Sequence, residues 1–279
     1  MTSLEVHRPS NSFMAFFTVH VMAFIFGILG NIVAFLVFLA PVPTFVKIFK
    51  KKSSDGFQSI PYLVALSSAM LLLYYGILKT DANMIISINA IGIAIEMAYL
   101  TIYLIFASKE AKMLTLKLLL LFNVVGYGLM LGLTLLLLKG ASRVNVVGWI
   151  CAVFSLAVFA APLGIMRRII RTKSVEFMPF TLSFSLTVCA AMWFFYGFFL
   201  KDMFIALPNV LGFLFGIAQM LLYMIYKNPN EIPVTKQQQQ KEEDPKLFTT
   251  VVDGPNITEM KIVCDSSTGP SGQININHV

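Results

Sequence analysis

Seven long apolar stretches dominate the chain of 279 residues, and six of them contain no Asp, Glu, Lys or Arg. These six are residues 9–46, 56–78, 118–138, 144–166, 177–200 and 203–226, and the seventh, 82–108, is interrupted only by Glu96. A helix that rises about 1.5 Å per residue needs about 20 apolar residues to cross a hydrocarbon core about 30 Å thick. The stretches therefore predict an all-α membrane protein with seven transmembrane helices. The strands of a membrane β-barrel would instead show about ten residues of alternating pattern.

Composition excludes several other classes of protein. Hydrophobic residues make up 57% of the chain and charged residues only 13%, whereas soluble domains carry about 25% charged residues. A disordered chain would not carry 25 Phe, 9 Tyr and 15 Met. The sequence contains no nucleotide-binding loop for ATP-driven pumping, and its three cysteines have no metal-site spacing. We therefore expect no enzyme activity, no cofactor and no metal.

The distribution of Lys and Arg predicts the orientation in the membrane. Eleven of these residues follow the first, third and fifth spans: Lys47, Lys50, Lys51, Lys52, Lys109, Lys112, Lys117, Arg167, Arg168, Arg171 and Lys173. The positive-inside rule assigns this side to the cytosol, so the N-terminus is expected outside and the C-terminus inside. The net charge of +7 is thereby explained by topology, and no nucleic-acid partner is expected.

An internal repeat divides the chain. Five matches recur in the same order at a shift of about 121 residues, namely 37–41 with 158–162, 52–53 with 173–174, 75–76 with 196–197, Asp81 with Asp202, and 89–92 with 209–212. One intervening helix starts the second repeat on the same side as the first, so the repeats are parallel. The predicted organisation is an extracellular N-terminus and approach (1–21), a three-helix repeat (22–108), a linker helix (109–140), a second repeat (141–226) and a disordered cytosolic tail (227–279).

Polar residues inside the spans are candidates for a substrate site at the repeat interface. Asn89 and Asn209 occupy equivalent positions, and two amides suit a neutral polyhydroxyl solute. Hydrogen bonding between helices is the alternative for both. Trp193 offers an aromatic face to a sugar ring, or else packs in the core or against lipid. Its repeat counterpart is Leu72.

Two further sets of residues are candidate gates. Four prolines lie near the predicted cytosolic ends of spans and are interpreted as hinges of an inner gate, or simply as helix starts: Pro41, Pro61, Pro162 and Pro179. Tyr75 and Asp202 lie near the outer ends of spans in opposite repeats. A phenol–carboxylate hydrogen bond between them would close an outer gate; solvated loop residues are the alternative.

Glu96 is the one carboxylate inside a predicted span, and its counterpart is Gly216. A carrier coupled to protons or sodium usually needs such groups. Because Glu96 has no symmetric mate, we interpret it as structural.

Several motifs resemble those of plant SWEET sugar transporters, and the resemblance extends from about residue 24 to residue 226. The motifs are FGILGN at 26–31, LAPVPTF at 39–45, GFQSIPY at 56–62, RTKSVEFMPF at 171–180 and LPNVLG at 207–212. The resemblance implies passive, bidirectional sugar transport by alternating access, a fold of 3+1+3 helices and homo-oligomers in the plasma membrane. It assigns sugar contacts to Asn89, Asn209 and Trp193, the inner gate to the four prolines, and the outer gate to Tyr75 with Asp202.

Within the family the chain is most similar to the sucrose-transporting clade. The positions implied to set substrate size fall on small side chains: Val37, Ser68, Val158 and Cys189. Two residues depart from that clade, because Leu72 stands where Trp is general and Cys189 where Ser is general. We therefore expect a facilitative sucrose carrier. A hexose-selective carrier of the same family, a carrier of another small solute and a seven-span receptor are the alternatives.

Overall fold

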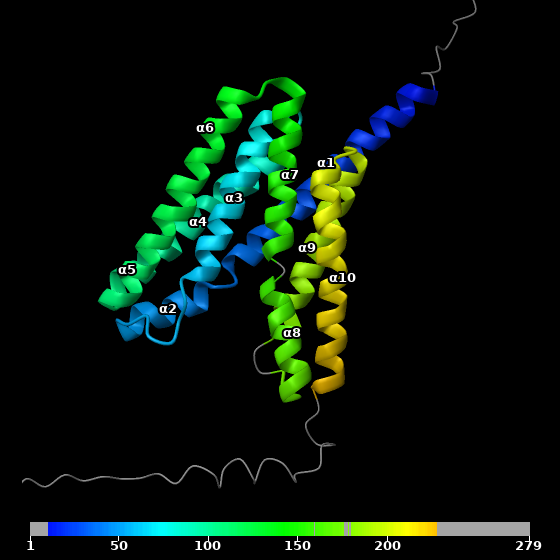
Figure 1. Cartoon of the computed structure of the whole chain (residues 1–279). Helices are drawn as coiled ribbons and strands as arrows, with labels where there is room; N and C mark the ends of the chain where they lie inside the picture. The colour runs from blue at the N-terminus through cyan, green and yellow to red at the C-terminus, as the bar shows by residue number, and fades with distance from the viewer. Residues whose placement is uncertain (1–10, 159, 176–177, 179, 228–279) are drawn as a thin grey trace, which may run out of the picture. The chain divides into compact units, whose positions relative to one another are not determined.

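The computed structural model describes residues 11–158, 160–175, 178 and 180–227, with side chains from residue 18 onward except those of 160 and 161. All regular structure in this part of the chain is helical (Figure 1). Seven helical segments within it are long and apolar enough to cross a membrane, which confirms the predicted fold class. The predicted tail, except Lys227, and Pro179 lie outside the described residues, as do residues 1–10 of the predicted N-terminal segment.

The helices follow the order of the two repeats and the linker. The first repeat contains α1 (Asn11–Leu39), α2 (Val42–Lys51), α3 (Ile60–Leu78) and α4 (Asn83–Phe106). The linker contains α5 (Lys109–Leu118), the π-helix η1 (Leu119–Gly126) and α6 (Tyr127–Leu137). The second repeat contains α7 (Gly140–Val158), α8 (Ala160–Thr172), α9 (Phe180–Phe199) and α10 (Met203–Tyr226). The first and fifth spans thus each consist of two helices, α1–α2 and α7–α8.

Proline explains the break in the first span. Pro41 has no N–H and stands at the N-cap of α2, where its carbonyl accepts hydrogen bonds from the N–H groups of Thr44 (2.9 Å) and Phe45 (3.2 Å). Its repeat counterpart Pro162 is in the first turn of α8, where a missing N–H costs no helical hydrogen bond.

In each repeat the last helix packs against both other spans. α4 contacts α1 and α3, and α10 contacts α7 and α9. The repeats meet through two equivalent pairs, α1 with α9 and α3 with α7, while the linker packs through η1 and α6 on α3 and through α6 on α7. Figure 1 shows α7 beside α3 and α9 beside α10. Four helices, α1, α3, α7 and α9, therefore form the boundary between the repeats.

The repeats also agree residue by residue at the ends of their first spans. Ile48 in α2 and Ile169 in α8 are both fully buried. The residues after these helices, Lys52 and Lys173, both adopt left-handed backbone conformations, with φ of 54° and 53°. α2 and α8 are thus structural counterparts, which bears on the comparison of their charged faces below.

Close packing at Gly197 leads to a prediction on stability. A Cβ atom added there would lie 2.8 Å from the backbone N of Ala206 and 3.0 Å from the carbonyl oxygen of Asp202. Because backbone atoms cannot move aside cheaply, Gly197→Ala is expected to lower the free energy of unfolding by about 1–3 kcal/mol. Thermal unfolding of the purified protein measures this change.

Gly132 in α6 provides the matched control, because a Cβ added there would meet nothing within 4 Å. Gly132→Ala is expected to leave stability unchanged or raise it by up to about 1 kcal/mol, the difference in helix propensity. Equal melting temperatures for Gly197→Ala and the unmodified protein would contradict the packing argument.

Candidate functional site

The two candidate asparagines have the same local geometry. Asn89 in α4 donates its side-chain N–H to the carbonyl of Ile85 at 2.8 Å, and Asn209 in α10 donates to the carbonyl of Ile205 at 2.8 Å. Asn89 is 7% exposed, and Asn209 is half-buried. Within the described part of the chain neither side chain makes a second hydrogen bond. Each amide therefore has one N–H and its oxygen available for a ligand.

Trp193 in α9 is held against the boundary between the repeats. Its ring lies over Gly30 of α1, where an added Cβ would come within 3.2 Å of Cε2. It also meets Tyr196 edge to face, with ring centroids 5.2 Å apart. Trp193 and its counterpart Leu72 both pack on one buried cluster that contains Tyr75, Tyr196 and Ile205. The structure thus brings Leu72 and Trp193 to the same cluster.

The four positions implied to set substrate size come from the four helices at the boundary between the repeats. Val37 lies in α1, Ser68 in α3 and Cys189 in α9, all half-buried, while Val158 is the last residue of α7 and 36% exposed. Cys189 is a free cysteine. All four side chains are small, as the prediction of a size-setting role requires.

The predicted outer-gate residues are in direct contact. The Tyr75 hydroxyl lies 2.9 Å from each carboxylate oxygen of Asp202 and donates to that carboxylate. Both side chains are buried, with Tyr75 1% exposed and the Asp202 side chain 1% exposed. The same carboxylate caps α10, since Asp202 Oδ1 accepts the N–H of Phe204 at 3.1 Å. This contact links α3 of the first repeat to the start of α10 in the second.

Lys79 is a third member of this contact and was not among the predicted gate residues. Its Nζ forms an ion pair with Asp202. Lys79 is the first residue after α3, four positions beyond Tyr75, and its Nζ lies 5.4 Å from the centroid of the Tyr75 ring. The spacing of four positions was the signal in the sequence.

The symmetric contact is absent. Tyr196 is the repeat counterpart of Tyr75, yet its hydroxyl is buried without a hydrogen-bond partner among the described residues. Asp81, the counterpart of Asp202, is exposed and has a left-handed φ of 56°. The repeats therefore differ at this end of the molecule.

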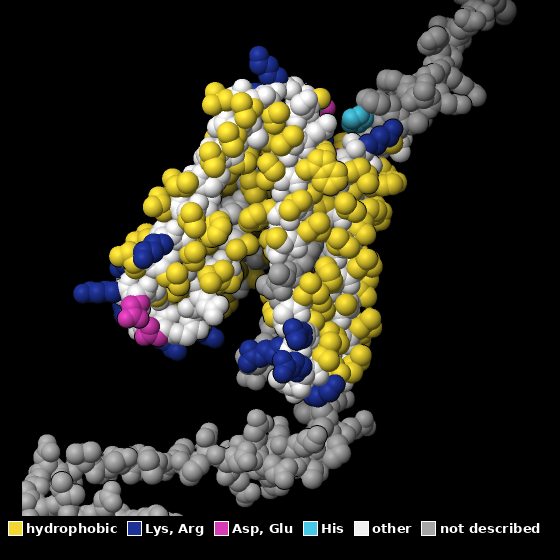
Figure 2. All heavy atoms as spheres, viewed as in Figure 1, with side chains coloured by type: hydrophobic (Ala, Val, Ile, Leu, Met, Phe, Trp, Pro, Cys, Tyr) yellow, Lys and Arg dark blue, Asp and Glu magenta, His cyan; other side chains and the backbone are white. Residues whose placement is uncertain are grey.

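At the end of the spans opposite to the Tyr75–Asp202 contact, the two repeats are partly separated at the surface. The space-filling view is hollowed between the end that carries α2 of the first repeat and α5 of the linker and the end that carries α8 of the second repeat (Figure 2). Pro41 and Pro162 lie where the two broken spans restart, and Pro61 lies in the first turn of α3. Each of these three prolines thus stands at a helix start on the side that carries the clustered Lys and Arg residues.

Glu96 in α4 is 4% exposed, and its Oε2 atom has no hydrogen-bond partner in the described part of the chain. No group of three or more His, Cys, Asp or Glu residues within that part could hold a metal ion.

Comparisons with known proteins agree on one family. The family model described as "Sugar efflux transporter for intercellular exchange" matches residues 24–111 and 145–231. The bidirectional sugar transporter SWEET9 of Arabidopsis thaliana is 56% identical over 244 residues, which cover 87% of this chain and 95% of that one. The bidirectional sugar transporter NEC1 of Petunia hybrida is 60% identical over 211 residues, 76% of this chain and 79% of that one. A eukaryotic SWEET transporter solved at 3.7 Å has a TM-score of 0.72 and 35% identity, covering 75% of this chain and 99% of that one.

Proposed function

The chain belongs to the family of sugar efflux transporters for intercellular exchange, and from this premise we propose that it is a bidirectional, facilitative sucrose carrier that works by alternating access. Membership in this family excludes the seven-span receptor considered above, and the relatives are transporters rather than enzymes. Carriers for hexose are the alternative within the family.

The observation that supports alternating access is the difference between the two ends of the spans. At one end Tyr75, Asp202 and Lys79 join the repeats through buried contacts. At the other end the surface is hollowed between the repeats (Figure 2). A carrier that exposes its site to one side of the membrane at a time needs a state closed at one end and open at the other, and a second state with the two ends exchanged. We infer that this conformation opens toward the cytosol.

The proposal includes a sugar site between the repeats, which the polar and aromatic groups of the candidate residues support. Asn89 and Asn209 offer one N–H and one oxygen each, and Trp193 offers an aromatic ring to the C–H face of a pyranose. Val37, Ser68, Val158 and Cys189 contribute little bulk, which favours a disaccharide. The inner gate is assigned to Pro41, Pro61, Pro162 and Pro179 on the same proposal.

Location and assembly are part of the proposal. We assign the protein to the plasma membrane as a homo-oligomer, surrounded by lipid, with its N-terminus outside and its C-terminus in the cytosol. Epitope tags at the two termini test the orientation in intact and permeabilised cells. Antibody access to the C-terminal tag in intact cells would contradict it. Size-exclusion chromatography with light scattering in detergent measures the oligomeric state, and a monomer would contradict the assembly.

Tracer flux in liposomes tests the transport function. Purified protein is expected to equilibrate radiolabelled sucrose faster than protein-free liposomes, with glucose measured in parallel. Faster flux of glucose than of sucrose would assign the hexose alternative, and no flux of either sugar in folded protein would refute sugar transport. An imposed proton gradient is expected to leave the final sucrose distribution unchanged, whereas accumulation against the sucrose gradient would refute a passive mechanism.

A second aromatic platform is expected to increase sucrose transport. Leu72 packs on the same cluster as Trp193, so Leu72→Trp adds a ring at the symmetric position. Aromatic contacts contribute about 0.5–1.5 kcal/mol beyond burial of area, which corresponds to sucrose uptake about 2- to 10-fold higher at equal expression. Ile77→Trp, on the same helix but 61% exposed, is the control and is expected to have no effect. Unchanged or lower uptake by Leu72→Trp would contradict the prediction.

A further inference from the structure

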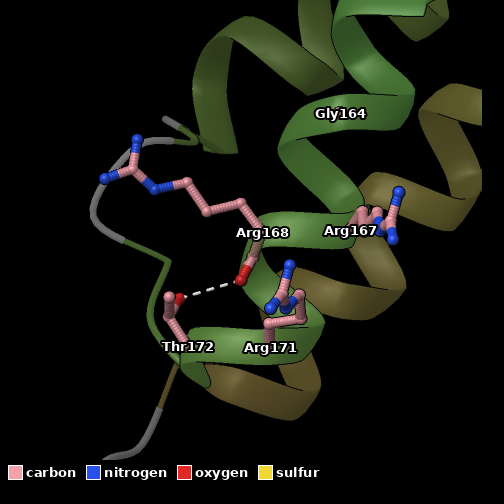
Figure 3. A pocket seen from close by; sticks show the side chains of 5 residues that line it. All are labelled: Gly164, Arg167, Arg168, Arg171 and Thr172. Atoms are coloured by element: carbon pink, nitrogen blue, oxygen red, sulfur yellow. Dashed lines mark hydrogen bonds between the residues drawn. The ribbon is translucent and has the colours of Figure 1, made fainter.

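A pocket rich in arginine lies on α8, away from the candidate sugar site. It has a volume of about 540 Å³ and is lined by Gly164, Arg167, Arg168, Arg171 and Thr172. Figure 3 shows these five residues along α8, with the Thr172 hydroxyl donating to the backbone carbonyl of Arg168 at 2.9 Å. Three arginines of one helix thus line the same pocket.

The charges of Arg167 and Arg171 are not neutralised within the described part of the chain. Neither residue forms an ion pair there with a carboxylate. They are four residues apart on one helix, and like charges at this spacing destabilise the helix. A bound anion would convert this repulsion into attraction.

The equivalent helix of the first repeat has different charge chemistry. α2 and α8 share their buried positions, with Ile48 and Ile169 both fully buried. At the repeat shift, however, Arg167 corresponds to Val46, Arg168 to Lys47 and Arg171 to Lys50. A lysine presents a single point charge, whereas the planar guanidinium group donates two parallel hydrogen bonds to a phosphate. Only α8 therefore carries the group that suits phosphate recognition.

The surroundings of the pocket favour a ligand from the membrane. Leu163 and Ile170, on the same helix, are 46% and 47% exposed, so apolar side chains that suit hydrocarbon lie close to the arginines. The end of α8 is fixed to α10, because Lys173 Nζ donates to the Tyr226 hydroxyl at 2.8 Å. Clusters of Lys and Arg next to a transmembrane span or on an amphipathic helix bind anionic lipid headgroups, and Arg167, Arg168, Arg171 and Lys173 form such a cluster. We propose that the α8 pocket binds the phosphate group of an anionic phospholipid.

The test is a thermal-shift titration of the full-length protein in a neutral detergent. The probes are dioctanoyl phosphatidylinositol 4-phosphate, dioctanoyl phosphatidylcholine and sodium phosphate. At about 100 times its Kd the anionic lipid is expected to raise the melting temperature by about 5 °C or more. Phosphatidylcholine and sodium phosphate are expected to cause no such rise. An equal rise with sodium phosphate would confirm an anion site but overturn the lipid assignment.

Variants locate the effect at the pocket. The double variant Arg167→Gln/Arg171→Gln is expected to lose the shift, whereas Lys47→Gln/Lys50→Gln, at the counterpart positions of α2, is expected to keep it. Arg167→Lys/Arg171→Lys keeps the charge without the guanidinium geometry and is expected to show less than half of the shift. If the Gln variant keeps the full rise in melting temperature, the lipid does not bind at this pocket and the proposal is overturned. If that variant does not fold, a full shift in the Lys variant would overturn recognition by guanidinium.

Discussion

Asp202→Asn is expected to reduce sugar flux by about tenfold or more while leaving the protein folded. The Asp202 carboxylate accepts from Tyr75 and pairs with Lys79, and its side chain is only 1% exposed. Hydrogen bonds to charged groups contribute about 1.5–3 kcal/mol each, a factor of about 10 to 150 in population. The amide removes the negative charge but keeps the oxygen that caps α10 at Phe204. The change is therefore expected to destabilise the proposed outer gate more than it destabilises α10.

The repeat supplies the control for this prediction. Asp81 is the counterpart of Asp202, but it is exposed and has no ion pair within the described residues. Asp81→Asn is expected to retain flux within about twofold, since exposed charges contribute little. Tracer uptake into liposomes at equal protein incorporation measures both variants. If Asp202→Asn has the same flux as the unmodified protein, Asp202 has no role in the gate. Equal losses of flux in both variants would instead assign the effect to surface charge.

Replacing the paired asparagines is expected to have the second large effect. Asn89→Ala and Asn209→Ala each remove one uncommitted N–H and one oxygen from the proposed sugar site. A hydrogen-bonding group lost from a polar site costs about 1–3 kcal/mol, so each change is expected to raise the apparent KM for sugar about 5- to 150-fold. The stability of α4 and α10 is expected to change little, because the carbonyls of Ile85 and Ile205 each lose only the additional hydrogen bond from an asparagine side chain.

Asn123 is the control for a buried asparagine outside the proposed site. It lies in η1 and accepts a hydrogen bond from the Ser67 hydroxyl at 2.7 Å. Asn123→Ala is expected to lower the melting temperature without changing the apparent KM. Concentration-dependent tracer uptake separates the two effects. A normal KM in Asn89→Ala and Asn209→Ala would leave these amides with a purely structural role.

The sequence predicted the spans and their symmetry because both depend on local composition. Charge-free stretches long enough to cross a bilayer have few alternative folds. Pro41 was interpreted as a hinge or a helix start, and it stands at the break between α1 and α2. The π-helix η1 has no sequence signal that we recognise.

Contacts between individual side chains were harder to predict than the positions of the helices. The pairing of Tyr75 with Asp202 was expected from the repeat, but symmetry alone predicts the pair Tyr196 and Asp81 equally well. Which of two equivalent contacts forms depends on the arrangement of the repeats in space. A single chain sequence does not contain that arrangement in any local pattern.

The Tyr196 hydroxyl has no hydrogen-bond partner among the described residues, whereas its counterpart Tyr75 has one. This difference shows how two copies in one chain diverge after duplication. Two separate copies of one three-helix subunit, related by symmetry, would form every contact between them twice. Fusion into one chain allows each copy to change alone, and here Lys79 has Leu200 as its counterpart. Among the described residues, the proposed outer gate therefore has one ionic contact between the repeats instead of two. In the proposed cycle, opening this gate breaks one such contact instead of two.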